Sequence, residues 1–234
     1  MYEVDKTSNG AAAQPAYVAI LKNVYMWMCS ALVVSGLVAI VVSENPTLLS
    51  FLYANNFNLI LVCLAQVGLV WYISARIESI SFVTATLLFI LYSALTGFTM
   101  SSIFLLFTVE SIASVFFITA GTFAAVSLYG YITKRDLSTA GSYLRMALIG
   151  LIIASVVNLF MKSETLYWIV SYAGVLIFVG LTAYDTQKIK QMAAHFADTD
   201  NEISNKVALL GAITLYLDFI NLFLYILRIF GRRK

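Results

Sequence analysis

The stretch that decides the fold of this chain is VALLGAITLYLDFINLFLYILRIF, residues 207–230. Asp218 lies near its middle, and most of its other side chains are apolar. A hydrocarbon layer about 30 Å thick is crossed by about 20 apolar residues in a helix. Because the layer holds no water, each spanning segment has to satisfy its own backbone hydrogen bonds. The stretch is therefore predicted to be a transmembrane helix.

The composition of the whole chain points the same way. Of its 234 residues, 61% are hydrophobic and 11% are charged, whereas soluble domains carry about 25% charged residues. Lipid is therefore the expected solvent for much of the surface. The net charge of +2 argues against a nucleic-acid partner, which would require a basic face. Cys29 and Cys63 lie in apolar runs without disulfide or zinc spacing, and we expect them to be small core residues.

Further apolar runs separated by polar connections predict an all-α integral membrane protein with seven transmembrane helices. Residues 17–230 are expected to form a single transmembrane domain, between a mobile polar tail, residues 1–16, and a basic tail, residues 231–234. Residues 188–206 are the expected long polar loop. The other runs are residues 17–43 and 57–75, two helices within 79–133 that are divided at 101–108, and residues 143–161 and 166–187.

The distribution of lysine and arginine predicts the orientation. These residues are enriched in the cytoplasmic loops of membrane proteins. With the N-terminus inside, most of them fall on the inner side, and the outer loops carry only Lys162. The N-terminus is therefore predicted to be cytoplasmic. One feature conflicts with this bias, because seven full spans place the basic residues 232–234 outside.

Charges inside the spanning helices are the candidate functional residues, since each costs about 2.5–3.5 kcal/mol at the bilayer centre. Helical spacing places Asp218 on one face with Thr214, Asn221 and Tyr225. This polar stripe should face protein or water, where its residues could line a pore or ion site. The alternative is a hydrogen bond between helices that only stabilises packing.

A second stripe includes Thr182 and Asp185, within residues 166–187. It could pack against the stripe of Asp218 and bring the two carboxyl groups within hydrogen-bonding reach. Alternatively, Asp185 is an interfacial acid paired with Lys188 or Lys190.

Arg76 follows the run 57–75. It is either a cation that marks the inner end of its helix, with Glu78 as a partner, or a neighbour of the two aspartates. His195 has no partner at metal-ligand spacing and is expected to be solvated.

The chain resembles the transmembrane Bax inhibitor motif family, and its short loops look like those of a bacterial member. The resemblance extends over nearly all of the chain after the first tail. It rests on four segments: KNVYMWM at 22–28, YGYITKRDL at 129–137, AYDTQKI at 183–189 and LDFINLF at 217–223.

This resemblance implies a seven-helix fold with a central last helix, and a pH-sensitive calcium leak in the bacterial inner membrane. The carboxylates of the family match Asp185 and Asp218, and its helix-two arginine matches Arg76. Some relatives carry an acid in the second helix where this chain has Gln66, so a role that needs that acid is not expected here. The basic C-terminal tail of animal relatives is reduced to residues 232–234.

Elementary electrostatics agrees with a pH-sensitive gate. Two carboxylates in a site of low dielectric constant tend to share a proton, and its loss leaves a negative site that could admit a cation. Ca²⁺ takes 6–8 oxygen ligands, so Asp185 and Asp218 are expected to hold it only transiently. No resident cofactor is expected; lipid, protons and Ca²⁺ are the expected partners.

Two aspartates on late helices also occur in intramembrane aspartyl proteases. The glycine-rich motif of those enzymes is absent before Asp218, and both prolines, Pro15 and Pro46, lie early in the chain. The chain is therefore not expected to be an enzyme. Two alternatives remain. One is a proton-coupled transporter. The other is a non-conducting regulator that binds another membrane protein, such as a protease or a stress component.

Overall fold

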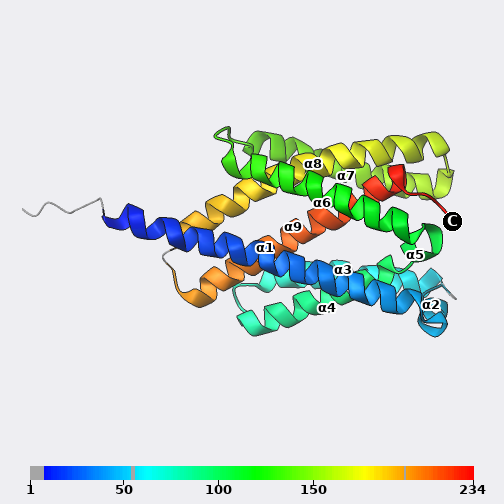
Figure 1. Cartoon of the computed structure of the whole chain (residues 1–234), viewed down its shortest axis with the longest axis horizontal. Helices are drawn as coiled ribbons and strands as arrows, with labels where there is room; N and C mark the ends of the chain where they lie inside the picture. Colours follow the sequence, from blue (N-terminus) through cyan, green and yellow to red (C-terminus); the bar gives the residue numbers. More distant parts are fainter. Residues whose placement is uncertain (1–7, 54–55, 198) are drawn as a thin grey trace, which may run out of the picture. The chain divides into compact units, whose positions relative to one another are not determined.

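The computed structural model describes residues 8–53, 56–197 and 199–234, and these residues are almost entirely helical (Figure 1). Within them, seven helical segments are long and apolar enough to cross a membrane, with α4 and α5 together forming one of them. The predicted fold class is confirmed. The helices are α1 (Ser8–Ser43), α2 (Pro46–Tyr53), α3 (Asn56–Arg76), α4 (Phe82–Met100), α5 (Ile103–Leu106), α6 (Val109–Ile132), α7 (Ser138–Met161), α8 (Glu164–His195) and α9 (Asn201–Phe230).

Several helix boundaries differ from the prediction. The expected loop 188–206 is mostly helical, because α8 continues to His195 and α9 begins at Asn201. The prediction was wrong here because polarity was read as loop, although lysine, glutamine, methionine and alanine all favour a helix. At the other end of the chain, α1 begins at Ser8, inside the expected tail 1–16; residues 1–7 lie outside the described part of the chain.

Local capping explains several of the boundaries. The hydroxyl of Thr108 accepts a hydrogen bond from the backbone N–H of Ser111 at the start of α6. At the end of α7, Lys162 adopts the left-handed conformation, with φ 51°, and its N–H donates to the carbonyl of Asn158. The side chain of Asn158 then accepts from the N–H of Ser163, which closes the short hairpin to α8.

Contacts between Cα atoms divide the chain into two compact units. Of the described residues, unit 1 contains those up to Ser102 and those from Ile189 to Ile213, and unit 2 contains residues 103–188 and 214–234, so the residues of α8 and α9 are divided between them. The single domain expected for residues 17–230 stays a prediction.

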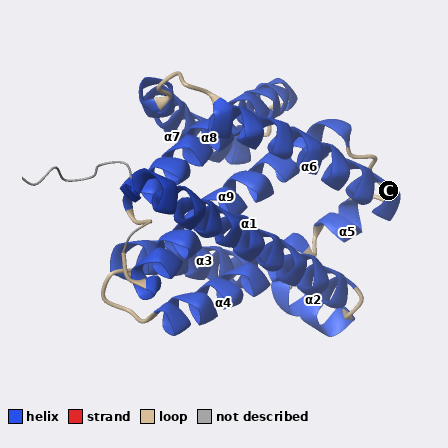
Figure 2. Ribbon diagram, turned by 60° about the vertical axis from the view of Figure 1, so that its left-hand side comes forward, coloured by secondary structure: helices blue, strands red, loops and turns tan. Residues whose placement is uncertain are grey.

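In unit 1, α1 packs along α4, and the two ribbons lie side by side in both views (Figures 1 and 2). The hydroxyl of Ser35 on α1 donates to the carbonyl of Ser93 on α4 at 2.7 Å. Gly97 lies directly against the backbone of Ser35. Small residues at this crossing allow the close approach that membrane helices use for packing.

In unit 2, aromatic rings join α6 to the second half of α9. The ring of Phe219 contacts Phe116 and Phe123 edge to face, with centroids 5.5 and 5.4 Å apart. Gly130 near the end of α6 lies against the backbone of Ala183 on α8. The close crossing fixes the height of α8 relative to α6.

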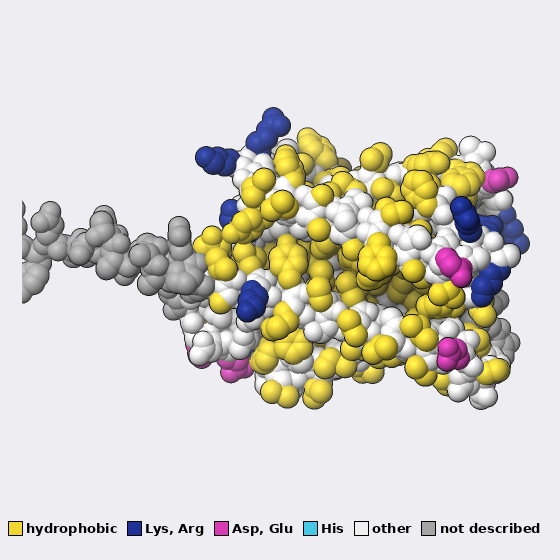
Figure 3. Space-filling model, viewed as in Figure 1, with side chains coloured by type: hydrophobic (Ala, Val, Ile, Leu, Met, Phe, Trp, Pro, Cys, Tyr) yellow, Lys and Arg dark blue, Asp and Glu magenta, His cyan; other side chains and the backbone are white. Residues whose placement is uncertain are grey.

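The outer surface is apolar, as expected for helices that face lipid. Hydrophobic side chains cover much of the visible surface in Figure 3, with charged side chains toward the helix ends. In the most apolar 18-residue stretch of each spanning segment, the share of buried residues is lowest in α3 and α7, at 6% each, and highest in α9, at 61%. The central position of α9 stays a prediction. Cys29 and Cys63 are exposed, so the expectation that they are core residues was wrong, because in lipid an apolar run can face outward.

The C-terminal tail lies beside the connection from α5 to α6 within unit 2. The N–H of Thr108 donates to the carbonyl of Arg232 at 3.1 Å, and the N–H of Lys234 donates to the carbonyl of Leu106 at 3.0 Å. The Arg233 guanidinium donates to the hydroxyl of Tyr167, near the start of α8, at 3.4 Å. The tail therefore shares one end of unit 2 with the α5–α6 and α7–α8 connections, as a full crossing by α9 requires.

Candidate functional site

Within unit 2, α8 and α9 are antiparallel neighbours that meet at two levels. At one level, the ring of Phe178 stacks on that of Tyr225, with centroids 5.8 Å apart, and Gly174 leaves room for the same tyrosine. At the other level, the side chains of Asp185 and Asp218 meet. Asp185 follows Phe178 by seven residues and Tyr225 follows Asp218 by seven, or about two helical turns. Both contacts therefore lie on the same face of each helix.

The two carboxyl groups lie within hydrogen-bonding reach of each other. Asp218 is 5% exposed, and its Oδ2 has no hydrogen-bond partner among the described residues. Asp185 is half-buried. A carboxylate has no hydrogen to donate, so a bond between these groups exists only when one of them carries a proton.

The other residues expected on the two polar stripes mostly bond within their own helices. The hydroxyl of Thr182 donates to the carbonyl of Phe178 at 2.7 Å. The side-chain amide of Asn221 donates to the carbonyl of Leu217 at 2.8 Å. Thr214 is half-buried at the start of the α9 residues that belong to unit 2. A pore-lining role for Thr182, Thr214, Asn221 and Tyr225 stays a prediction.

Arg145 is a cation near the aspartate pair. The spacing of residues in the sequence could not reveal this proximity. It lies on α7, with its guanidinium 5.3 Å from the centre of the Tyr184 ring. Arg145 and Lys188 both act on Asp185 electrostatically. Tyr184 adjoins Asp185 in the sequence, but no pattern links Arg145 to it, because the two residues lie on different helices.

Arg76, the expected third member of the site, is the last residue of α3 and is exposed. Neither it nor Glu78 forms an ion pair with a described residue. Arg76 thus has the position expected of a cation that marks the end of its helix. A role for Arg76 in the site stays a prediction. His195 is exposed at the end of α8, and the described residues contain no cluster of three or more metal-binding side chains.

The segment 129–137 is held to α8 by one side chain. The amide oxygen of Gln187 accepts from the N–H of Leu137 at 2.9 Å, and its amide nitrogen donates to the carbonyl of Arg135 at 2.8 Å. Asp136 in the same loop accepts hydrogen bonds from Ser138, which hold the pKa of its exposed carboxyl below the usual range. The loop thus fixes α6 and α7 against the part of α8 that carries Asp185.

Comparison with known proteins agrees with this architecture. The sequence model described as "Inhibitor of apoptosis-promoting Bax1" matches residues 18–234. The chain is 52% identical to the inner membrane protein YbhL of Escherichia coli over 214 residues, which cover 92% of each chain. It is 49% identical to a protein of Borreliella burgdorferi over 92% of each chain. It is 43% identical to a protein of Rickettsia prowazekii over 91% of this chain and 89% of the other. The chain is thus an integral, multi-pass membrane protein that belongs to the Bax inhibitor family.

Proposed function

We propose that this protein is a pH-sensitive calcium leak of the bacterial inner membrane, and that the Asp185–Asp218 pair is its gate. The observation that carries the proposal is the contact of two carboxyl groups between α8 and α9, one of them 5% exposed. An acid inside a membrane helix is costly and is therefore a functional candidate by default.

A shared proton closes the gate. Two carboxylates at hydrogen-bonding distance in a site of low dielectric constant cannot both ionise cheaply, and they titrate as a pair. With one proton between them, the hydrogen bond holds α8 against α9. Loss of the proton places two negative charges in contact, which pushes the helices apart and creates an attractive site for a cation. Calcium flux should therefore rise with pH.

The same residues suit brief occupation by Ca²⁺. The ion takes 6–8 oxygen ligands, and two aspartates supply only part of that set. Water and backbone carbonyls would have to complete it, so the ion is held loosely and can leave again, as permeation requires. In this proposal the described conformation is assigned to the closed state, because Asp218 is 5% exposed in it.

Calcium uptake into proteoliposomes tests this function. Purified protein in vesicles that contain a calcium-sensitive dye should admit Ca²⁺ faster than protein-free vesicles, and the difference should increase from acidic to neutral pH. Uptake equal to that of empty vesicles at every pH would contradict the leak. That result would favour the alternative, a regulator that acts by binding another membrane protein.

We further propose that the N-terminus is cytoplasmic, which lysine and arginine enrichment on that side supports. In a background with Cys29→Ser and Cys63→Ser, cysteines at Asp200 and Glu44 report the two sides. A membrane-impermeant maleimide added to intact spheroplasts should label Asp200→Cys poorly and Glu44→Cys strongly, with the reverse in inverted vesicles. Labelling of both positions from the same face would contradict the seven-span orientation.

A further inference from the structure

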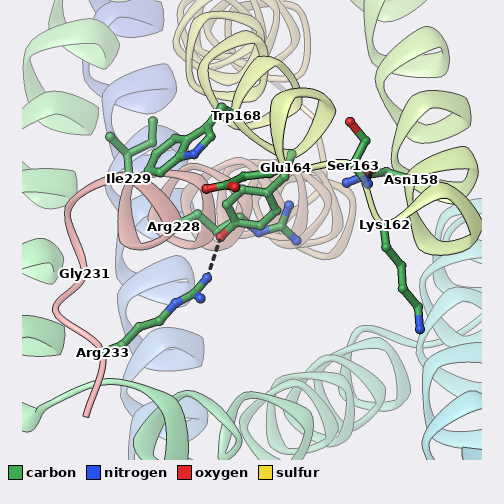
Figure 4. Close-up of a pocket in the computed structure, with 10 residues that line it drawn as sticks. Asn158, Lys162, Ser163, Glu164, Trp168, Arg228, Ile229, Gly231 and Arg233 are labelled. Atoms are coloured by element: carbon green, nitrogen blue, oxygen red, sulfur yellow. Dashed lines mark hydrogen bonds between the residues drawn. The ribbon is translucent and has the colours of Figure 1, made fainter.

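A cavity of about 480 Å³ lies in unit 2, where the α7–α8 connection, the end of α9 and the C-terminal tail come together. Figure 4 shows residues that line it, including Lys162 from the connection, Arg228 from α9 and Arg233 from the tail. Trp168 and Glu164 come from the first turns of α8. The cavity is separate from the aspartate pair, which is not part of its lining.

The lining is rich in cations that have no charge partner. The lining contains three cations, Lys162, Arg228 and Arg233, and one acid, Glu164; none of the cations forms an ion pair with a described residue. The guanidinium of Arg228 lies 5.9 Å from the ring centre of Tyr167 and 5.1 Å from that of Tyr225. Aromatic contacts thus hold the guanidinium in place without neutralising its charge.

The backbone conformation of Lys162 independently indicates a role for this lysine. Lys162 is the non-glycine residue with positive φ in the described part of the chain. Glycine or asparagine is favoured in this left-handed position at a helix end, and other residues are strained there by about 1 kcal/mol. A lysine thus belongs to the cavity lining in spite of the backbone preference at this position.

An apolar groove continues from this cavity. A second cavity of about 500 Å³ shares Asn158, Tyr167 and Arg228 with the first. It then runs along Ile152, Val156, Leu159 and Val170. Ile152, Val156 and Leu159 belong to the exposed, lipid-facing surface of α7. The combined space therefore has a cationic end and an apolar body that opens to the hydrocarbon.

We propose that this space binds one phospholipid with an anionic headgroup, with its phosphate at Lys162, Arg228 and Arg233 and an acyl chain in the groove along α7. Guanidinium groups match the oxygen geometry of a phosphate, and one acid against three cations leaves a net attraction for a negative headgroup. Trp168 and Tyr167 are residues of the type that anchors proteins at headgroup level.

The site also accounts for the charge distribution. With a cytoplasmic N-terminus, Lys162 and the basic tail 232–234 lie on the outer side, against the usual bias. Lys162 and Arg233 both line the cavity. A bound anionic lipid gives these outward cations a reason to be there.

Native mass spectrometry of the full-length protein in detergent tests the proposal. Phosphatidylglycerol and phosphatidylcholine with identical acyl chains are added in equal amounts. Wild type should retain one phosphatidylglycerol in preference to phosphatidylcholine. Arg228→Gln and Lys162→Asn should each bind it about fivefold more weakly, the equivalent of about 1 kcal/mol per lost cation. Lys162→Asn should fold at least as well as wild type, because asparagine suits the left-handed position.

The control is Lys134→Gln, which removes an exposed cation from the α6–α7 connection of the same unit. It should leave lipid retention unchanged. Equal retention of the two lipids by wild type, or an equal loss in Lys134→Gln and Lys162→Asn, would overturn the proposal.

A competition experiment separates a lipid from a free phosphate. Inorganic phosphate and glycerophosphoglycerol, the headgroup without acyl chains, should not displace the lipid at equal concentration. Displacement by either would show that the site takes a soluble phosphate. Val156→Trp, which narrows the groove without touching a cation, should weaken lipid retention as well. Unchanged retention in this variant would overturn the assignment of the acyl chain.

Discussion

Replacing Asp218 with asparagine is expected to flatten the pH dependence of calcium flux. Asparagine has nearly the same size and keeps a hydrogen-bonding side chain, so α8 and α9 should still pack. The variant cannot lose a proton at this position, so the repulsion that opens the gate no longer develops as the pH rises. Uptake into proteoliposomes at a series of pH values measures the effect. The prediction concerns the pH profile and not the total flux. The substitution removes both the shared-proton hydrogen bond that holds α8 against α9 and the repulsion that separates them.

The same logic requires Asp185 and Asp218 to act as one unit. Asp185→Asn should also flatten the profile, since one aspartate alone cannot form the pair. The double variant should differ from the stronger single variant by less than about 0.5 kcal/mol, or roughly twofold in rate. Glu110→Gln is the control, because it removes an exposed acid from the first turn of α6 in the same unit. Additive effects, or wild-type pH profiles in both single variants, would show that the aspartates are structural.

Adding one methyl group at Gly130 is expected to destabilise the protein strongly. A Cβ there would meet the carbonyl oxygen of Ala183 and lie 3.0 Å from its Cα. The obstacle is backbone, which cannot move aside as a flexible side chain can, so α6 and α8 would have to separate. Overpacking of this kind costs about 1–3 kcal/mol. Gly130→Ala should therefore unfold at a lower temperature in detergent, and it should also disturb the aspartate pair, since α8 carries Asp185.

Gly121→Ala on the same helix is the matched control. Nothing lies within 4 Å of a Cβ at this position, and alanine is favoured over glycine in a helix by about 1 kcal/mol. The melting temperature should therefore stay the same or rise. A melting temperature of Gly130→Ala equal to that of Gly121→Ala would mean that α6 and α8 do not cross as closely as described.

Local properties of the sequence were enough to predict the spans. Whether a run of residues crosses lipid depends on its length and apolar content, so residues 207–230 could be assigned without knowing any neighbour. The same reasoning missed the helical continuation of α8 to His195, because polar residues beyond the apolar run can be helix or loop with almost the same composition. It also misplaced Cys29 and Cys63, since an apolar residue in a membrane protein can face either lipid or core.

The sequence by itself thus determined the class, the seven spans and the positions of the costly charges, including Asp185 and Asp218. The tertiary structure decided which of these charges meet. It placed Asp185 beside Asp218, brought Arg145 near them from α7, and gathered Lys162, Arg228 and Arg233 around one cavity. The difference has a physical reason. Crossing lipid is a property of one segment, whereas contact between side chains depends on the height and rotation at which helices pack, which residues such as Gly130 and Gln187 set from outside the site.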